Sequence, residues 1–449
     1  MKKIFSLIIG LACCGSMGAQ QTFSLEQLKQ LAVENNYNLR SARNAIQQSQ
    51  EQRKEAFTKY FPNVQASGIG FTLNKHLLDI DIPAVPQGIL PPGISLPSNI
   101  SLLKRGVFGE VAAIQPVFMG GMIINSNKLA KVGQEASEIK LEVSEDQVEL
   151  TTEQYYWGAV TLKEKLKTLG SVHSMLTELE KDVTNMVRVG VVNRNDLLQV
   201  QLRKGEIEST QVEVESQLTT ICQLLAQHVG KTDEKIDVTL PAELTTQIEG
   251  NRAGTSHPNV ALPLAIKKDH QAAVAAVPQY RLLEKNVESQ RLLHKMKVGQ
   301  NMPKVGVGAA YTYNNISDKN RGSGALFAGI NIPLSGWWGG SHAIKKQKMA
   351  YEDAKEQLED SGQKLIINMN NAWAAVETSY KKLLIAYDAI GQADENLRLN
   401  RDYYRVGKTN MTDLLTAQEK YQQARDRYTD AYATFQTKQL EYRQATGQE

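Results

Sequence analysis

The second half of this chain repeats its first half at one fixed separation. A short motif, Arg-Val-Gly followed by Asn and by Asp-Leu-Leu, occurs twice, and a proline and a glycine in each half keep the same spacing. The pairs, each 217 positions apart, are Arg188-Val189-Gly190 with Arg405-Val406-Gly407, Asn193 with Asn410, Asp196-Leu197-Leu198 with Asp413-Leu414-Leu415, Pro116 with Pro333, and Gly230 with Gly447. A duplicated chain predicts two similar units and a quasi-symmetric fold.

The first residues have the layout of a secretory signal. Lys2 and Lys3 precede a short apolar run, and small residues follow it up to Ala19. We therefore predict a signal peptide over residues 1–20. Cys14 leaves lipidation open as an alternative to removal of the whole segment. Removal of both N-terminal cysteines would leave Cys222, so that no intramolecular disulfide is expected.

Composition and motifs speak against several classes of function. The formal net charge of +3 gives no reason to expect a nucleic-acid partner. The seven histidines show no metal-ligand spacing, and neither a phosphate-binding glycine loop nor a nucleophile motif is present. We therefore expect neither an enzyme nor a bound cofactor or metal.

Four short segments have the residue pattern of β-strands. A capping box at Ser24 and helical periodicity predict a helix that ends near Tyr60. Glycine-dotted, alternating segments follow in each half, and a Pro-rich insert separates the first two. The predicted strands lie at about 63–74, 107–116, 304–314 and 325–333. Each is long enough to cross a bilayer when tilted.

The strands of one chain are too few to close a barrel. Open strand edges are not tolerated in hydrocarbon, so a membrane location requires several copies to share one barrel. Three copies would supply 12 strands. The sequence thus predicts a mainly α-helical chain with a small membrane β part.

Long helices fill most of the remaining chain. After Gly120-Gly121 and again after Gly339-Gly340, about 65 residues keep helical periodicity without an internal proline. Each copy of the repeated Arg-Val-Gly motif marks the turn at the end of a long helix, which we call a tip. A shorter helix follows each tip, and the second of these helices carries a heptad seam that begins at Leu414. We predict a first repeat over 21–230, a mostly irregular connecting segment over 231–277 and a second repeat over 278–449, with the helical hairpins forming an α-barrel.

The repeated motif has a local structural logic. Gly190 and Gly407 can adopt the left-handed conformation that ends a helix. Asn193 and Asn410 are placed to cap the next helix. The residues could do no more than make the turn, or the turn could also be a docking or gating surface. Its occurrence at the same end of two hairpins favours the second interpretation.

Aromatic residues flank the predicted strands. Phe118 follows the second strand, and Trp337 and Trp338 follow the fourth. Aromatic side chains at strand ends are typical of a membrane–water interface, although core packing at a strand–helix junction is the alternative.

With these features together, the chain resembles the TolC-like outer membrane efflux proteins over nearly its whole length after the signal. Four passages carry the resemblance. They are Ser24-Leu25-Glu26-Gln27-Leu28 with Glu34-Asn35-Asn36, Gln115-Pro116-Val117-Phe118-Met119-Gly120-Gly121, the first tip, and Tyr404-Arg405-Val406-Gly407-Lys408-Thr409-Asn410 followed by Asp413-Leu414-Leu415.

The resemblance implies a homotrimer in the bacterial outer membrane, in contact with its lipid, with the helices in the periplasm. It implies a passive exit duct that receives small molecules from an inner-membrane pump through a periplasmic adaptor. The implied docking residues are Val189, Gly190, Val191, Val406, Gly407 and Lys408. The implied periplasmic gate residues are Tyr404, Arg405, Asp413, Asp196 and Arg188.

One position departs from the family pattern. TolC carries a second Asp one turn after the position of Asp413, and this chain has Thr416 there. A paired acidic constriction is therefore not expected. Two other functions remain open: a duct for secreted polypeptides, and a soluble periplasmic coiled-coil scaffold.

Overall fold

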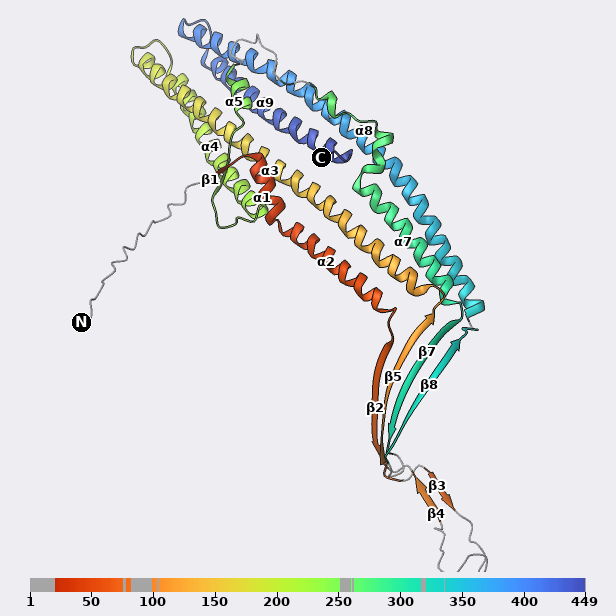
Figure 1. Ribbon diagram of the computed structural model, residues 1–449. Coiled ribbons are helices and arrows are strands. Elements are labelled where there is room, and N and C mark those ends of the chain that lie inside the picture. Colours follow the sequence, from red (N-terminus) through yellow and green to blue (C-terminus); the bar gives the residue numbers. More distant parts are fainter. Residues whose placement is uncertain are drawn as a thin grey trace, which may run out of the picture. The chain divides into compact units, whose positions relative to one another are not determined.

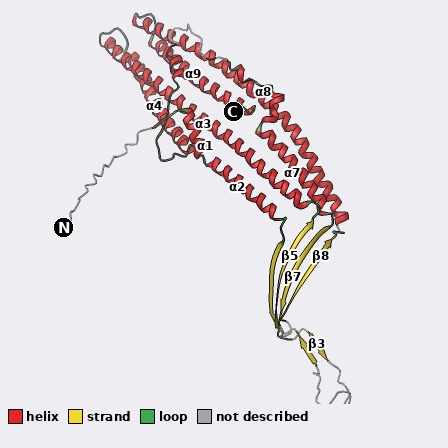
Figure 2. Cartoon of the chain, in the orientation of Figure 1, coloured by secondary structure: helices red, strands yellow, loops and turns green. Residues whose placement is uncertain are grey.

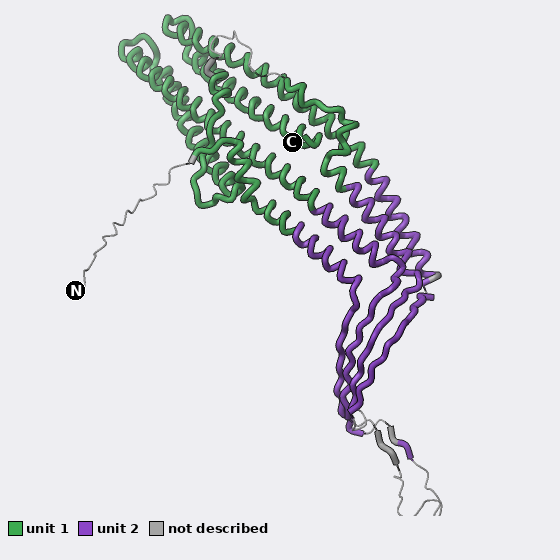
Figure 3. Tube along the Cα trace, viewed as in Figure 1, with its two compact units in different colours: residues 1–45, 138–282, 359–449 green, residues 46–137, 283–358 purple. Residues whose placement is uncertain are grey.

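The computed structural model describes residues 21–75, 78–81, 99–102, 105–250, 260, 262–315, 320–334 and 336–448. The predicted signal peptide, with Cys14, lies outside these residues. The described chain is mainly helical (Figures 1 and 2). It divides into two compact units (Figure 3): unit 1 comprises residues 1–45, 138–282 and 359–449, and unit 2 comprises 46–137 and 283–358.

The elements follow one another in a helix–strand–helix pattern that occurs twice. In chain order they are β1 (Gln21–Phe23), α1 (Leu25–Asn35), α2 (Tyr37–Thr58), β2 (Asn63–Thr72), β3 (Leu78–Asp81), β4 (Asn99–Leu102), β5 (Arg105–Phe118), α3 (Met122–Arg188), α4 (Arg194–His228), β6 (Ile236–Val238), α5 (Ala242–Gly250), η1 (Leu264–Ile266), α6 (His270–Ala273), η2 (Val274–Ala276), α7 (Pro278–Gln300), β7 (Lys304–Asn314), β8 (Arg321–Asn331), α8 (Gly336–Arg405) and α9 (Met411–Ala445).

The predicted first helix is in fact two helices. The capping box forms as expected: the Gln27 amide donates to Ser24 Oγ over 3.3 Å, and the Ser24 amide donates to Gln27 Oε1 over 2.9 Å. The helix then breaks at Asn36, whose backbone is extended. The Asn36 side chain accepts from the Asn38 amide and donates to the His228 carbonyl oxygen. These tertiary and capping bonds compensate for the interruption.

The long helices are α3, with 67 residues, and α8, with 70 residues. Helix α8 begins at Gly336, earlier than the sequence suggested, after a turn in which the Gly336 amide donates to Pro333 O. Gly340 therefore lies inside the helix. A Cβ atom there would lie 2.0 Å from Asn301 Oδ1, so any larger residue would require the Asn301 side chain to move.

The core of unit 1 is built along the predicted seam of α9. Tyr428, Phe435 and Tyr442 are fully buried. Trp157 of α3 packs edge-on against Tyr432, with ring centroids 5.6 Å apart. Edge-to-face aromatic pairs add to the stabilisation that comes from burial alone.

The connecting segment is more ordered than predicted. Strand β6 pairs in parallel with β1, with Gln21 opposite Ile236 and Phe23 opposite Val238. Val238 of β6 and Leu244 of α5 are fully buried. Burial of these apolar side chains stabilises β6 and α5 within the connecting segment.

Unit 2 contains a four-stranded antiparallel sheet with the order β2-β5-β7-β8. Strand β8 spans Arg321–Asn331, whereas the predicted fourth strand was 325–333. The register places Tyr311 opposite Val111 and Ala309 opposite Leu326 on one face, which is predominantly apolar. The other face carries most of the polar side chains: Asn63, Gln65, Ser67, Glu110, Lys304, Thr312, Asn314, Arg321, Ser323 and Asn331.

Two glycines allow the end of α7 to approach the turn between β5 and α3. Gly120 has a φ angle of 61°. A Cβ atom on Gly120 would lie 2.3 Å from Gly299 O, and one on Gly299 would lie 2.2 Å from Gly120 O. Both positions therefore require glycine, because the backbone itself fills the space.

Candidate functional site

The two helical tips of unit 1 are built in the same way. At the first tip, the Gly190 amide donates to Val187 O and the Val191 amide donates to Met186 O. At the second, the Gly407 amide donates to Tyr404 O and the Lys408 amide donates to Tyr403 O. This is the Schellman pattern, in which a left-handed residue ends the helix. Gly190 and Gly407 have φ angles of 76° and 70°, as the sequence predicted.

The tips present apolar side chains to solvent. Val189, Val191 and Val406 are 66–71% exposed, and Lys408 is also exposed. A Cβ atom added to Gly190 or Gly407 would have no described atom within 4 Å, apart from those of the two adjacent residues. The surface around both glycines is therefore open, and these glycines are required by backbone conformation rather than by lack of space.

The caps after the two turns differ. Asn410 Oδ1 accepts from the Asp413 amide over 2.8 Å, so that Asn410 caps α9 as predicted. Asn193 makes no side-chain cap bond to α4, which is a departure from the prediction. Its backbone carbonyl accepts from the Asp196 amide instead. The identical residue type thus makes different bonds at the two tips.

The structure brings two of the expected gate residues together. Tyr404 belongs to the end of α8, and Asp196 lies in the first turn of α4. Tyr404 is 8% exposed, and its hydroxyl makes no hydrogen bond to any residue that the structure describes. Burial, and then the nearby Asp196 carboxylate, raise the pKa of Tyr404 to about 12. Tyr404 is therefore a neutral, buried contact between the two repeats.

The other expected gate residues stay apart from that contact. Asp413 is exposed and accepts a hydrogen bond from Thr409 Oγ1 over 3.0 Å. Arg405 is exposed, and Arg188 donates to Asn185 Oδ1 within its own helix. Within one chain, these charges do not form the network that a closed entrance would need.

Tyr404 also lines a small cavity that sequence reasoning missed. The cavity has a volume of about 30 Å³ and lies among α3, α8 and α9. Besides Tyr404, its polar lining consists of Asp182, Arg401, Arg405 and Gln418. Gln418 is 1% exposed and accepts from Arg203 Nε over 3.1 Å, which joins α9 to α4. Only its position beside the α9 seam could have indicated its burial.

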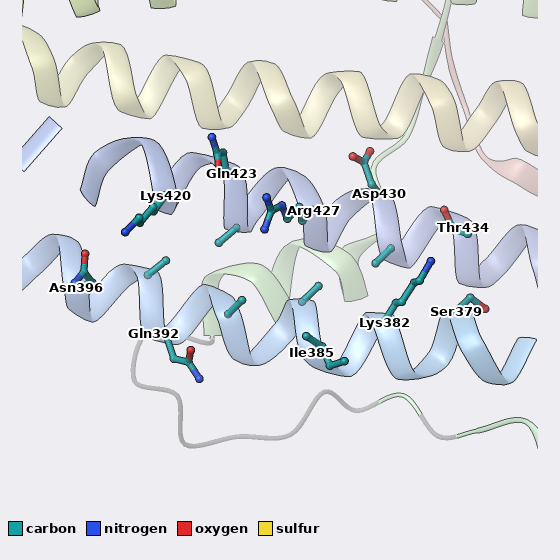
Figure 4. A pocket seen from close by; sticks show the side chains of 15 residues that line it. Ser379, Lys382, Ile385, Gln392, Asn396, Lys420, Gln423, Arg427, Asp430 and Thr434 are labelled. Carbon is teal, nitrogen blue, oxygen red and sulfur yellow. The ribbon is translucent and has the colours of Figure 1, made fainter. Parts of the chain in front are cut away.

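A larger groove lies between α8 and α9 and was not expected either (Figure 4). It has a volume of about 690 Å³. Lys382 and Ile385 of α8 and Lys420 and Arg427 of α9 line it. Five alanines also line it: Ala386, Ala389, Ala393, Ala424 and Ala431.

The expected interface aromatics lie at the end of β5 and in the first turn of α8, which follows β8. Phe118 is the last residue of β5, beyond a register shift between Pro116 and Phe118, and is 46% exposed. Trp338 is 73% exposed in the first turn of α8. Trp337 lies in the same turn, and its side chain is outside the described part of the structure. Exposure of such large rings needs an explanation beyond core packing.

Metal and membrane-helix signals are missing from the described residues. No group of three or more His, Cys, Asp or Glu residues there is arranged to hold a metal ion. Among the described helices, none is long and apolar enough to span a membrane.

Comparison with known proteins agrees with this architecture. Residues 271–448 match the model of the outer membrane efflux protein family. Comparison with curated protein sequences finds no match. The CmeC outer membrane channel of Campylobacter jejuni aligns with a TM-score of 0.75 at 14% identity, over 94% of this chain and 85% of that one.

Two further solved structures have the same fold. The MtrE outer membrane channel of Neisseria gonorrhoeae, in its open state, aligns with a TM-score of 0.70 at 17% identity, over 94% of this chain and 89% of that one. The outer membrane protein VceC of Vibrio cholerae aligns with a TM-score of 0.72 at 13% identity, over 94% and 96% of the two chains.

Proposed function

We propose that this chain, whose residues 271–448 belong to the outer membrane efflux protein family, is the outer membrane channel of a tripartite efflux system. In this role it is a passive exit duct for small molecules. An inner-membrane pump delivers them through a periplasmic adaptor. The sheet of unit 2 spans the outer membrane, and the helices of the chain lie in the periplasm.

The observation that carries this proposal is the sheet β2-β5-β7-β8. One face is predominantly apolar and the other bears most of the polar side chains, as in a strand pair between lipid and a water-filled lumen. Within the described residues, the outer edges of β2 and β8 pair with no further strand. Such edges need partners in a bilayer, and three copies joined edge to edge would supply a closed barrel of 12 strands.

The tips support the proposed docking of a periplasmic adaptor and the proposed periplasmic entrance. Val189, Val191 and Val406 present exposed apolar side chains on the hydrogen-bonded turns of the tips, which suits docking of an adaptor. In a trimer, Asp413 would occur as a ring of three carboxylates at the periplasmic entrance. With Thr416 one turn further on, the ring would be single, and it would attract cations in a narrow mouth.

The experiment that tests this function is fractionation of the full-length protein from cells, mass determination in detergent, and conductance in a planar bilayer. We expect a detergent-requiring trimer from the outer membrane that forms ion-conducting pores. A monomer or dimer released without detergent would overturn the channel and favour the soluble scaffold.

Docking can be tested separately from channel formation. Gly407→Trp would place a bulky side chain on a residue with φ of 70° at the tip. We expect trimers to persist and pump-dependent export to be lost. Full export by this variant would exclude the second tip as the docking surface.

A further inference from the structure

Unit 2 contains a second large groove, which the channel function does not use. The groove lies between α2 and α3 and has a volume of about 890 Å³. It is lined by the last turns of α2 and the first turns of α3. Four residues separate the end of α2 from the start of β2, and three separate the end of β5 from the start of α3. The groove is therefore directly adjacent to the strands.

The lining combines cations with apolar surface. Arg53, Lys54, Lys128 and Lys131 line the groove and are exposed. Phe57 is 56% exposed and Ile124 is 51% exposed, so that apolar atoms of both helices are open to whatever occupies it. Acidic residues are not part of the lining. An anionic head with an apolar tail would match both parts of this surface.

The positive charge of the groove is only partly compensated. Lys54 pairs with Glu51 over 2.7 Å, and Lys131 lies 3.5 Å from Glu135. Glu135 is itself shared with Lys285. Arg53 donates to the neutral side chain of Gln134, and Lys128 makes no ion pair within the described part of the chain. Arg53 and Lys128 therefore leave two positive charges available to a ligand.

We infer that this groove binds an anionic phospholipid, with its phosphate between Arg53 and Lys128 and an acyl chain along Phe57 and Ile124. The inference rests on the proposed membrane location, which puts the ends of α2 and α3 at the level of the lipid headgroups. Basic juxtamembrane residues attract anionic headgroups, whereas a zwitterionic headgroup gains little from them.

The test uses native mass spectrometry of the full-length trimer in detergent, titrated with phosphatidylglycerol or with phosphatidylcholine. The variant Arg53→Gln/Lys128→Gln removes the two available charges from side chains that are exposed and outside the core. Lys355→Gln/Lys364→Gln is the matched control, because it removes two exposed lysines of α8 that already pair with Glu352 and Asp360.

We expect the wild type and the control to retain phosphatidylglycerol in preference to phosphatidylcholine. The groove variant should lose roughly tenfold or more of its affinity for phosphatidylglycerol. Equal retention of the two lipids by the wild type, or equal loss in both variants, would overturn the inference. A groove variant that no longer forms trimers would do so as well, because the groove would then be a contact between copies.

Failure of the proposed function would look different. In that case the wild type would not be a trimer of the outer membrane, and the lipid site, which depends on that location, would be overturned together with the channel. A trimeric, conducting wild type that ignores phosphatidylglycerol would leave the channel intact and remove only the lipid site.

Discussion

The two helical hairpins of the chain follow the same path but are packed differently. In the hairpin of α3 and α4, large aliphatic side chains fill the space between the helices. In the hairpin of α8 and α9, the positions 217 residues later are alanines. The pairs are Leu169 and Ala386, Val172 and Ala389, Leu176 and Ala393, Ile207 and Ala424, and Val214 and Ala431.

The consequence is that these positions are buried in the hairpin of α3 and α4, whereas the equivalent positions of α8 and α9 line a groove. The five aliphatic residues of the first hairpin are all buried. Their alanine counterparts line the groove of about 690 Å³. Duplication thus conserved the turns, which depend on a few local residues, while the packing between the helices diverged.

The largest loss of stability should come from truncating a buried side chain between α3 and α4. Leu176→Ala removes a fully buried side chain and should cost about 2–5 kcal/mol of unfolding free energy, because a cavity remains. The reverse change, Ala393→Leu, extends into a groove and should cost far less. Thermal unfolding followed by circular dichroism in detergent would measure both. Equal losses would show that the two hairpins are packed alike.

The two tips should differ in how their acidic residues affect ion flow. Asp413→Ala removes an exposed carboxylate, and we expect a several-fold increase in leak conductance in planar bilayers if it helps to close the entrance. Asp196→Ala, at the equivalent position of the first tip, instead removes the charge beside the buried Tyr404. Unchanged conductance in the Asp413 variant would remove this residue from the gate.

Helix α9 should contribute a pH-dependent term to the stability of the protein that the equivalent position of α4 does not. Burial raises the pKa of the Asp426 carboxyl to about 6, whereas the equivalent residue of α4 is the exposed Ser209. Because the folded state holds this proton more tightly, its contribution to stability is fully present below about pH 4 and is lost as the pH rises through 6.

The variant Asp426→Asn keeps this partly buried position neutral at every pH. It should therefore raise stability at pH 7 by on the order of 1–2 kcal/mol and flatten the profile between pH 4 and 7. Melting temperatures measured over this range would check the effect. Profiles that run parallel for the variant and the wild type would contradict it.

The smallest expected effect concerns the helix caps. Asn410→Ala removes the side-chain bond to the Asp413 amide and should cost about 1 kcal/mol. Asn193→Ala removes no such bond and should cost close to nothing. Each variant is the control for the other, since both alter the same residue type at equivalent turns. Similar losses in thermal stability would refute the asymmetry.

Features with local causes were predictable from the sequence. The left-handed Gly190 and Gly407, the capping box at Ser24 and the alternating face of β7 each depend on a few neighbouring residues. The periodicity of α9 likewise indicated which of its residues are buried, including Tyr428 and Phe435.

Features with distant causes were not predictable in this way. The break at Asn36 depends on the His228 carbonyl, 192 residues away. The burial of Tyr404 depends on packing against the other repeat. The groove between α8 and α9 depends on how the two helices are arranged in space. A pattern along one helix does not reveal which of its neighbours fills the space beside it.

The pairing of β1 with β6 has a consequence for the order in which the chain folds. Gln21 lies opposite Ile236, so the two strands are separated by 215 residues. During synthesis from the N-terminus, β1 emerges long before the segment that completes it. Closing a loop of this length is slow compared with helix formation. We therefore expect β1, the first described element of the chain, to be among the last elements to reach its native pairing.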